Sequence, residues 1–181
     1  MLPGSPSGPG GDLFAAGGEA GRLMAALDWA ATPVGAPATW PTELRVTVEM
    51  CFATRFPVLV TWGPELTMIY NDGYRDMLGT GKHPGAMGSA FADVFPEIWG
   101  DLLPSVESVI LRGEPSWVVD QHLVMRRNGY DEDTYFTYSY SPIRDSTDTV
   151  RGFLDIATET TERVVEQRRM RLLGDLSTAL T

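Results

Sequence analysis

The sequence has few residues of the kinds that form covalent cross-links and metal sites. Its single cysteine, Cys51, rules out an internal disulfide bond. Because Cys51 lies in an apolar helical pattern, we expect it to be a small buried hydrophobic residue. One cysteine and two histidines, His83 and His122, cannot supply the ligands of a structural zinc site. The acidic residues 131–133 lie in a predicted turn and are expected to be solvated, so no metal site is predicted.

Basic residues are outnumbered by acidic ones, 14 to 24, which gives a formal net charge of −10. Such a surface repels nucleic-acid phosphates and anionic lipid, so we predict neither nucleic acid nor membrane as a direct partner. A basic cluster, Arg163–Arg171, is interpreted as a solvated helix end. No apolar run approaches the roughly 18–20 residues of a membrane span, and the N-terminus lacks the layout of a signal peptide. We therefore expect a cytoplasmic protein.

The motifs of several common enzyme classes are missing as well. The sequence has no phosphate-binding loop of the Walker type and no G-x-S-x-G nucleophile elbow. It also has no cysteine–histidine pair at a useful spacing for nucleophilic catalysis. The chain is therefore predicted not to be an enzyme.

Aromatic residues are concentrated in one stretch, Asp133–Asp145 (DTYFTYSYSPIRD). Their alternation places Phe136, Tyr138 and Tyr140 on one side of a predicted strand. A polar turn and a second apolar run, Val150–Thr158, follow, which predicts an antiparallel hairpin. The face of the hairpin that carries the rings must be covered, either by protein alone or by protein and a small ligand.

Apolar periodicity and turn residues predict the remaining elements. Residues 1–11, almost entirely proline, glycine and serine, are predicted to be a flexible leader. Asn71 or Asp72 is expected to cap the helix that follows, and Pro142 to mark the end of ladder hydrogen bonding in its strand. The predicted helices are Glu19–Trp29, Pro41–Thr54, Gly73–Leu78, Ala90–Val94, Ile98–Arg112 and Thr160–Leu180. The other predicted strands are Val58–Trp62, Leu66–Tyr70 and Ser116–Arg126, with a loop at 79–88 and a turn at 128–133. This order predicts an α+β domain with a five-stranded antiparallel sheet and helices collected over one face.

Four short segments, in this order, resemble the PAS domain, a small sensory module of bacterial and eukaryotic signalling proteins. Residues 69–74 (IYNDGY) resemble its second strand and the asparagine-started helix, and residues 141–145 (SPIRD) resemble the close of its fourth strand. Residues 149–153 (TVRGF) resemble the start of its fifth strand. Residues 159–163 (ETTER) are similar to the D-I-T-E-R signature at the output helix, with glutamate in place of the usual aspartate.

The resemblance covers about Phe56–Arg163 and divides the chain accordingly. Residues 12–55 are predicted to be an N-terminal helical extension, whose helix Pro41–Thr54 resembles the cap helix of actinobacterial multidomain sensors. Residues 164–181 are predicted to be a C-terminal signalling helix. In such sensors a PAS domain precedes a GAF domain, a histidine kinase or a PP2C-like phosphatase. The resemblance therefore implies a downstream effector domain in a longer parent protein.

If the sheet is PAS-like, it encloses a pocket with the helices. Six residues of the aromatic hairpin are predicted to face this pocket: Phe136, Tyr138, Tyr140, Phe153, Asp155 and Ala157. The rings either fill an ordinary core or contact a ligand. Asp155 either faces inward, where it needs tyrosine partners or a proton, or a register shifted by one places it in solvent. His122 is predicted to face outward from its strand and His83 to be a solvated loop residue.

The cofactor is left open, although three familiar ones lack the residues they need. Flavin photochemistry of the LOV type requires a cysteine in an N-C-R-F-L-Q context, which is missing. Haem in PAS sensors is usually held by a helix histidine, and Ile98–Arg112 contains none. The thioester-linked chromophore of photoactive yellow protein also needs a pocket cysteine.

The resemblance implies a non-catalytic sensory module that binds a small molecule or a partner. The resulting change would pass through Glu159–Leu180 to an effector. The alternative is a ligand-free scaffold in which the helices Pro41–Thr54 and Thr160–Leu180 form a homodimer interface. The size of the cavity distinguishes these two hypotheses.

Overall fold

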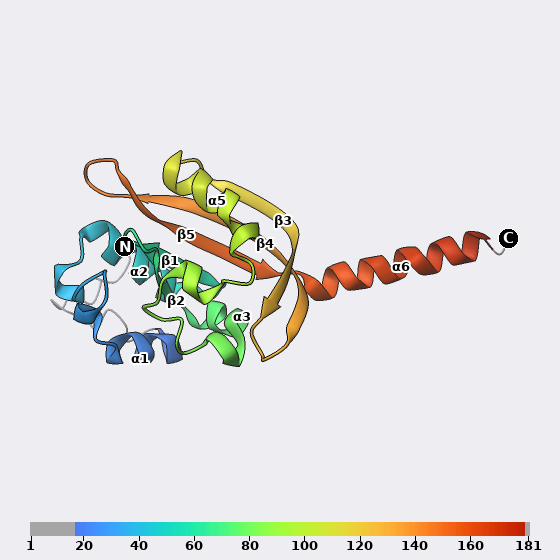
Figure 1. The fold of residues 1–181 in the computed structure, drawn as a ribbon, viewed down its shortest axis with the longest axis horizontal. Coiled ribbons are helices and arrows are strands. Elements are labelled where there is room, and N and C mark those ends of the chain that lie inside the picture. The colour runs from blue at the N-terminus through green and yellow to red at the C-terminus, as the bar shows by residue number, and fades with distance from the viewer. Residues whose placement is uncertain (1–16, 180–181) are drawn as a thin grey trace, which may run out of the picture.

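The computed structural model describes residues 17–179, and the predicted leader at residues 1–11 lies outside them. The chain folds as an α+β domain around one antiparallel sheet with the strand order β2-β1-β5-β4-β3 (Figure 1). The strands are β1 (Val58–Trp62), β2 (Thr67–Tyr70), β3 (Ser116–Arg126), β4 (Asp131–Arg144) and β5 (Val150–Glu159). The α-helices are α1 (Gly18–Ala26), α2 (Thr42–Ala53), α3 (Asp72–Lys82), α4 (Phe91–Val94), α5 (Trp99–Leu111) and α6 (Thr161–Ala179), and short 3-10 helices are η1 (Trp29–Ala31) and η2 (Pro37–Thr39). The predicted fold class is confirmed.

The strand β4 differs from its prediction at both ends. It begins at Asp131, inside the predicted turn, because Asp131 already pairs with Arg126 of β3. It also continues past Pro142, which pairs with Phe153 of β5, so the expectation that the ladder ends there is wrong. The pairing with β3 reaches only Tyr140. Pro142 therefore lies where β4 has a single neighbouring strand, a position that tolerates the missing N–H group.

Three helices, α3, α4 and α5, cover the inner face of the sheet, which carries the aromatic rings of β4. They follow one another between β2 and β3 (Figure 1). Their side chains, such as Leu78 and Leu102, line the space against the sheet. The helix α3 is longer than predicted because the chain kinks at Gly79 (φ 65°) and continues in helical conformation to Lys82. The helix α5 begins at Trp99, and Pro104 lies inside it.

The predicted cap helix is confirmed as α2, which packs on the opposite, outer face of the sheet. The register pairs Val60 with Ile69 and with Leu154, so these three side chains share the outer face. Val60 and Ile69 are fully buried. The helix α2 contacts β1, β2 and β4, and its Val46 lines a groove together with Leu154. The apolar outer surface of β1 and β2 therefore needs this N-terminal helix as its cover.

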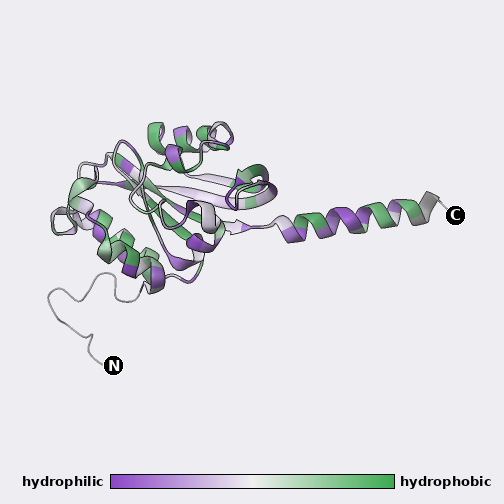
Figure 2. Ribbon diagram, turned by 60° about the horizontal axis from the view of Figure 1, so that its bottom comes forward, coloured by the Kyte–Doolittle hydropathy of each residue, from purple (hydrophilic) through white to green (hydrophobic). Residues whose placement is uncertain are grey.

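The last helix, α6, leaves the sheet at the end of β5 and extends away from the domain (Figure 1). Its first turns still contact the sheet, because the Thr160 N–H donates to the Tyr135 carbonyl at 2.7 Å and Arg168 lies over the Tyr135 ring, 4.8 Å from its centroid. Farther on, residues 171–176 are exposed, and Figure 2 shows polar and apolar residues alternating along the helix. Within residues 17–179, no helix is long and apolar enough to cross a membrane.

Candidate ligand chamber

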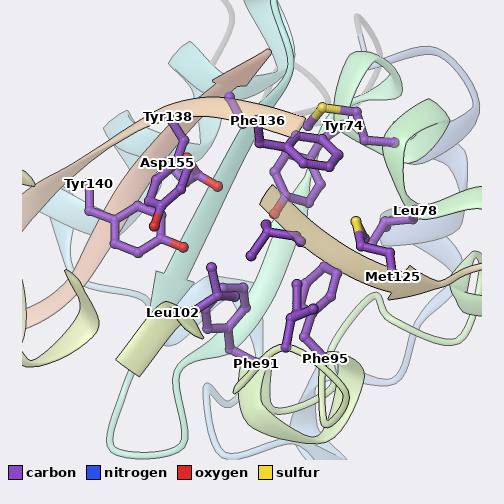
Figure 3. Close-up of a pocket in the computed structure, with 14 residues that line it drawn as sticks. Tyr74, Leu78, Phe91, Phe95, Leu102, Met125, Phe136, Tyr138, Tyr140 and Asp155 are labelled. Carbon is purple, nitrogen blue, oxygen red and sulfur yellow. The ribbon is translucent and has the colours of Figure 1, made fainter. Parts of the chain in front are cut away.

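A small chamber lies between the inner face of the sheet and the helices that cover it (Figure 3). Its volume is about 40 Å³, enough for a few water molecules. One of the six residues predicted to face the chamber, Phe153, does not line it. Phe153 is buried beside the chamber and stacks on Tyr140, with ring centroids 4.4 Å apart. The rings of the hairpin face inward, and their contact with a ligand stays a prediction. Five of the six predicted residues line the chamber: Phe136, Tyr138, Tyr140, Asp155 and Ala157.

Asp155 faces inward, which decides between the two registers that the sequence left open. It pairs with Tyr140 of β4 and Leu59 of β1, and it is 2% exposed. Its Oδ1 atom is buried and has no hydrogen-bond partner among the described residues. Burial raises the pKa of this carboxyl group to about 8, although a hydrogen bond with the Tyr74 side chain acts to lower it. The group is therefore mostly uncharged at neutral pH.

Tyr74 also lines the chamber, although it is not among the six residues predicted from the sequence. It is buried on α3 and supplies the hydrogen bond to Asp155, so the tyrosine partner comes from a helix rather than from the hairpin. Burial, followed by the nearby Asp155, raises the pKa of Tyr74 well above its ordinary value. The predicted cap at Asn71 is confirmed, because its side chain accepts from the Tyr74 N–H at 3.0 Å. This cap fixes where Tyr74 stands at the start of the helix.

Most of the remaining lining is apolar and comes from the covering helices, their flanks and β3. Tyr138 is held in place by Gln121 of β3, which accepts from its hydroxyl group at 2.6 Å, and it lies 3.4 Å from the Ser105 hydroxyl of α5. Within residues 17–179, no lysine, arginine or histidine side chain lines the chamber. The sequence indicated the other lining residues only as apolar members of their elements: Met77, Leu78, Phe91, Phe95, Ile98, Leu102, Leu123 and Met125.

The two histidines lie outside the chamber and differ in their surroundings. His122 faces outward, as predicted, and its Nε2 lies 2.6 Å from Asp133. His83 was predicted to be solvated, but its side chain is only 14% exposed. Its Nδ1 lies 3.0 Å from the Tyr70 hydroxyl group, and its Nε2 lies 3.3 Å from the Glu19 carboxylate of α1. The prediction for His83 is wrong because α1 folds back over the loop, a contact between segments distant in sequence.

The single thiol and the acidic turn are held in ordinary structural environments. Cys51 is buried, as predicted, and burial raises its pKa to about 12. Of the acidic residues expected to be solvated, Asp131 and Asp133 are exposed but Glu132 is mostly buried and pairs with Arg127. Across the described part of the chain, no three histidine, cysteine, aspartate or glutamate side chains are grouped so that they could hold a metal ion.

Arg127 connects a covering helix of the chamber to the start of α6. Its guanidinium group makes two hydrogen bonds to the Glu159 carboxylate, at 2.8 and 2.9 Å. It also donates to the carbonyl oxygen of Met77, a chamber residue on α3, at 3.0 Å. Burial alone would raise the pKa of Glu159, but Arg127 holds it below its ordinary value. None of the predictions from the sequence concerned Arg127.

Replacing Arg127 with leucine is expected to lower the free energy of unfolding by about 2–3 kcal/mol, because Glu132 and Glu159 then lose a partner in a mostly buried place. The matched control is Arg126→Leu. Arg126 pairs with Asp131, and both side chains are more than half exposed, so the expected loss is below about 0.5 kcal/mol. Urea unfolding followed by tryptophan fluorescence measures both. Equal losses would contradict the role assigned to Arg127.

Comparison with known proteins gives structural but not sequence relatives. No family model and no curated protein matches the chain. An RNA-binding light-oxygen-voltage receptor is similar with a TM-score of 0.51 and 14% identity, over 80% of this chain and 40% of the receptor. A light-oxygen-voltage domain from a flavin-analogue study has a TM-score of 0.50 and 16% identity, over 72% of this chain and 96% of that one. A PAS domain from Colwellia psychrerythraea has a TM-score of 0.49 and 15% identity, over 66% and 98%. At these identities the likeness establishes the fold alone.

Proposed function

We propose that this chain, which has the fold of PAS domains, is a non-catalytic cytoplasmic sensory module. Its chamber takes up a small molecule, and α6 passes the resulting change to an effector. The observation that carries this proposal is the Oδ1 atom of Asp155, a polar atom that is buried beside an apolar chamber and has no hydrogen-bond partner within residues 17–179. Burying such a group costs free energy of folding. A buried titratable group that destabilises the fold in this way marks a candidate functional site.

The relay in this proposal uses two connections between the chamber and α6. The first is the strand β5 itself, which carries Asp155 and Ala157 in the chamber and ends at Glu159, next to α6. The second is Arg127, which bonds both Met77 of the cover and Glu159. A ligand that moves the cover therefore changes the contacts that hold the first turn of α6. The ligand can shift the equilibrium between the two arrangements of the cover only to the extent that it binds one of them more tightly than the other.

A second candidate function is a ligand-free dimerisation scaffold, which the small volume of the chamber favours. Sites for drug-sized ligands have volumes of about 300–1,000 Å³, whereas this chamber has about 40 Å³. In both candidates we place a homodimer on α2 and α6. Exposed apolar side chains lie on both helices, among them Met50 on α2 and Leu172 and Leu176 on α6.

Filling the chamber with a side chain tests the sensory proposal without knowledge of the ligand. Ala157 is buried and lines the chamber, so Ala157→Leu inserts apolar volume where a ligand would lie. We expect amide hydrogen exchange in residues 161–168 to become about tenfold faster, because the contacts at Tyr135 and Glu159 loosen. Exchange in β3 serves as the internal reference for any general loss of stability.

The matched control is Ile156→Leu, on the outer face of the same strand, where the side chain is about half exposed. It should leave exchange in α6 within about twofold of the natural protein. If Ala157→Leu leaves exchange in α6 unchanged relative to β3, the chamber and α6 are not coupled. The sensory proposal would then be overturned in favour of the scaffold.

A further inference from the structure

We propose that the ligand of the chamber is a small organic cation, an ammonium or amidinium group on a compact aromatic body, whose nitrogen donates to Oδ1 of Asp155. This inference rests on the proposed function, because it names the class of molecule that the chamber takes up. It follows from the charge, the shape and the chemical character of the lining.

The charge of the lining selects against anions. Among the described residues, Asp155 supplies the single carboxyl group of the chamber, and its Oδ1 has no hydrogen-bond partner. Among the described residues, no lysine, arginine or histidine side chain lines the chamber. A carboxylate or phosphate on a ligand would find no positive partner there, and it would be repelled by Asp155 whenever that group is ionised. An N–H donor that carries positive charge instead gives the buried oxygen the partner that it lacks.

The walls beside Asp155 are aromatic. In Figure 3, Asp155 lies next to Tyr138 and Tyr140, with Leu102, Phe91 and Phe95 across the chamber. The rings of Tyr138 and Tyr140 have centroids 4.8 Å apart. Faces of aromatic rings attract a cation and also stack on a planar aromatic body. A ligand with both features therefore uses the carboxylate and the rings together.

The volume of the chamber limits the ligand to a compact molecule. The present volume is about 40 Å³. An engineered apolar cavity that binds benzene has a volume of about 150 Å³. Binding therefore requires the cover to move. Two side chains that line the chamber, Met77 of the covering helix α3 and Met125 of β3, are methionines, which adapt to new shapes at low cost. A single ring with a short amine arm is the size that such a movement accommodates.

The protonation of Asp155 gives the inference a second signature. The titratable groups that influence it are Tyr74 from α3 and Tyr138 and Tyr140 from β4, and Asp101 of α5 acts on Tyr138. The tyrosines have raised pKa values and stay neutral, so Asp155 is the group that titrates. Because burial raises its pKa to about 8, it carries a proton at pH 7 that a cationic ligand must displace to solvent. Binding of a cation is therefore coupled to release of about one proton.

The test uses three probes of the same size on the natural chain: benzylamine, benzyl alcohol and benzoate, titrated by calorimetry at pH 8. We expect benzylamine to bind at least about tenfold more tightly than benzyl alcohol, and benzoate to bind most weakly. The affinity for benzylamine should fall by about tenfold per pH unit below pH 8, with about one proton released in buffers of different ionisation enthalpy. Asp155→Asn should remove the preference for the amine, whereas Asp175→Asn on exposed α6 should keep it.

The outcomes separate this inference from the proposed function. If benzyl alcohol or benzoate binds as well as benzylamine, or if Asp155→Asn keeps the preference, the cationic class is overturned while the chamber remains a binding site. The variant Met125→Ala removes a lining side chain of β3 and enlarges the chamber, so that space does not limit the result. If none of the probes binds to the natural chain or to this variant, both the inference and the ligand-binding function are overturned.

Discussion

Replacing Asp155 with asparagine is expected to raise the free energy of unfolding by about 4 kcal/mol at pH 8 and to leave it almost unchanged near pH 4. Burial raises the pKa of Asp155 from 3.8 to about 8 in the folded chain. The folded state therefore holds a proton that the unfolded state releases above about pH 4, and stability falls as the pH rises from there to about 8. At about 1.4 kcal/mol per pKa unit the cost reaches about 5 kcal/mol. The asparagine amide is itself incompletely hydrogen-bonded at this site, which reduces the expected gain by about 1 kcal/mol.

Urea unfolding at a series of pH values measures this difference, with Asp175→Asn on the exposed part of α6 as the control. The control exchanges the same two side chains in solvent, so its effect should stay within about 0.5 kcal/mol at every pH. A gain for Asp155→Asn that does not depend on pH would contradict the protonation assigned to Asp155. A loss of stability at pH 8 would mean that the carboxylate has a partner in the folded protein.

A buried carboxyl group that weakens the fold is informative because a leucine or valine at the same place would pack without this cost. Asp155 interrupts a strand that is otherwise apolar or outward-facing. The sequence already showed this interruption, but it could not decide the face, because a shift of one residue reverses every side chain of a strand. The pairing of Asp155 with both Leu59 and Tyr140 settles the face, and this pairing depends on two strands distant in sequence.

The parts of the fold with a local signal could be predicted from the sequence. The aromatic alternation of β4 has a period of two, and it identified the inner wall of the chamber. Asn71 before a helical pattern identified the start of α3. The contacts that could not be predicted join remote segments: His83 with Glu19 of α1, and Arg127 with Glu159. Each of these polar groups would suit a solvated loop equally well, and only the folded chain brings the partners together.

The largest loss of stability is expected for Asn71→Asp, a change that keeps the shape of the side chain. Asn71 is 2% exposed, and its Nδ2 donates to the carbonyl oxygens of Cys51, Thr54 and Phe56 at 3.1, 2.9 and 2.7 Å. Its Oδ1 also accepts from the Val58 N–H at 3.0 Å. Aspartate places an oxygen opposite three carbonyl oxygens in a buried site. We expect the free energy of unfolding to fall by about 4 kcal/mol.

Two variants make this result specific to the amide of Asn71. Asn71→Ala removes the same hydrogen bonds without adding a repulsion, so it should cost about 3 kcal/mol, less than the isosteric aspartate. Asn128→Asp makes the same chemical change on an exposed turn and should cost less than about 1 kcal/mol. Urea unfolding at pH 7 measures all three. If aspartate is tolerated better than alanine at position 71, the amide does not donate to these carbonyl groups. The cap helix α2, the strand β1 and the start of α3 would then be joined by something other than this side chain.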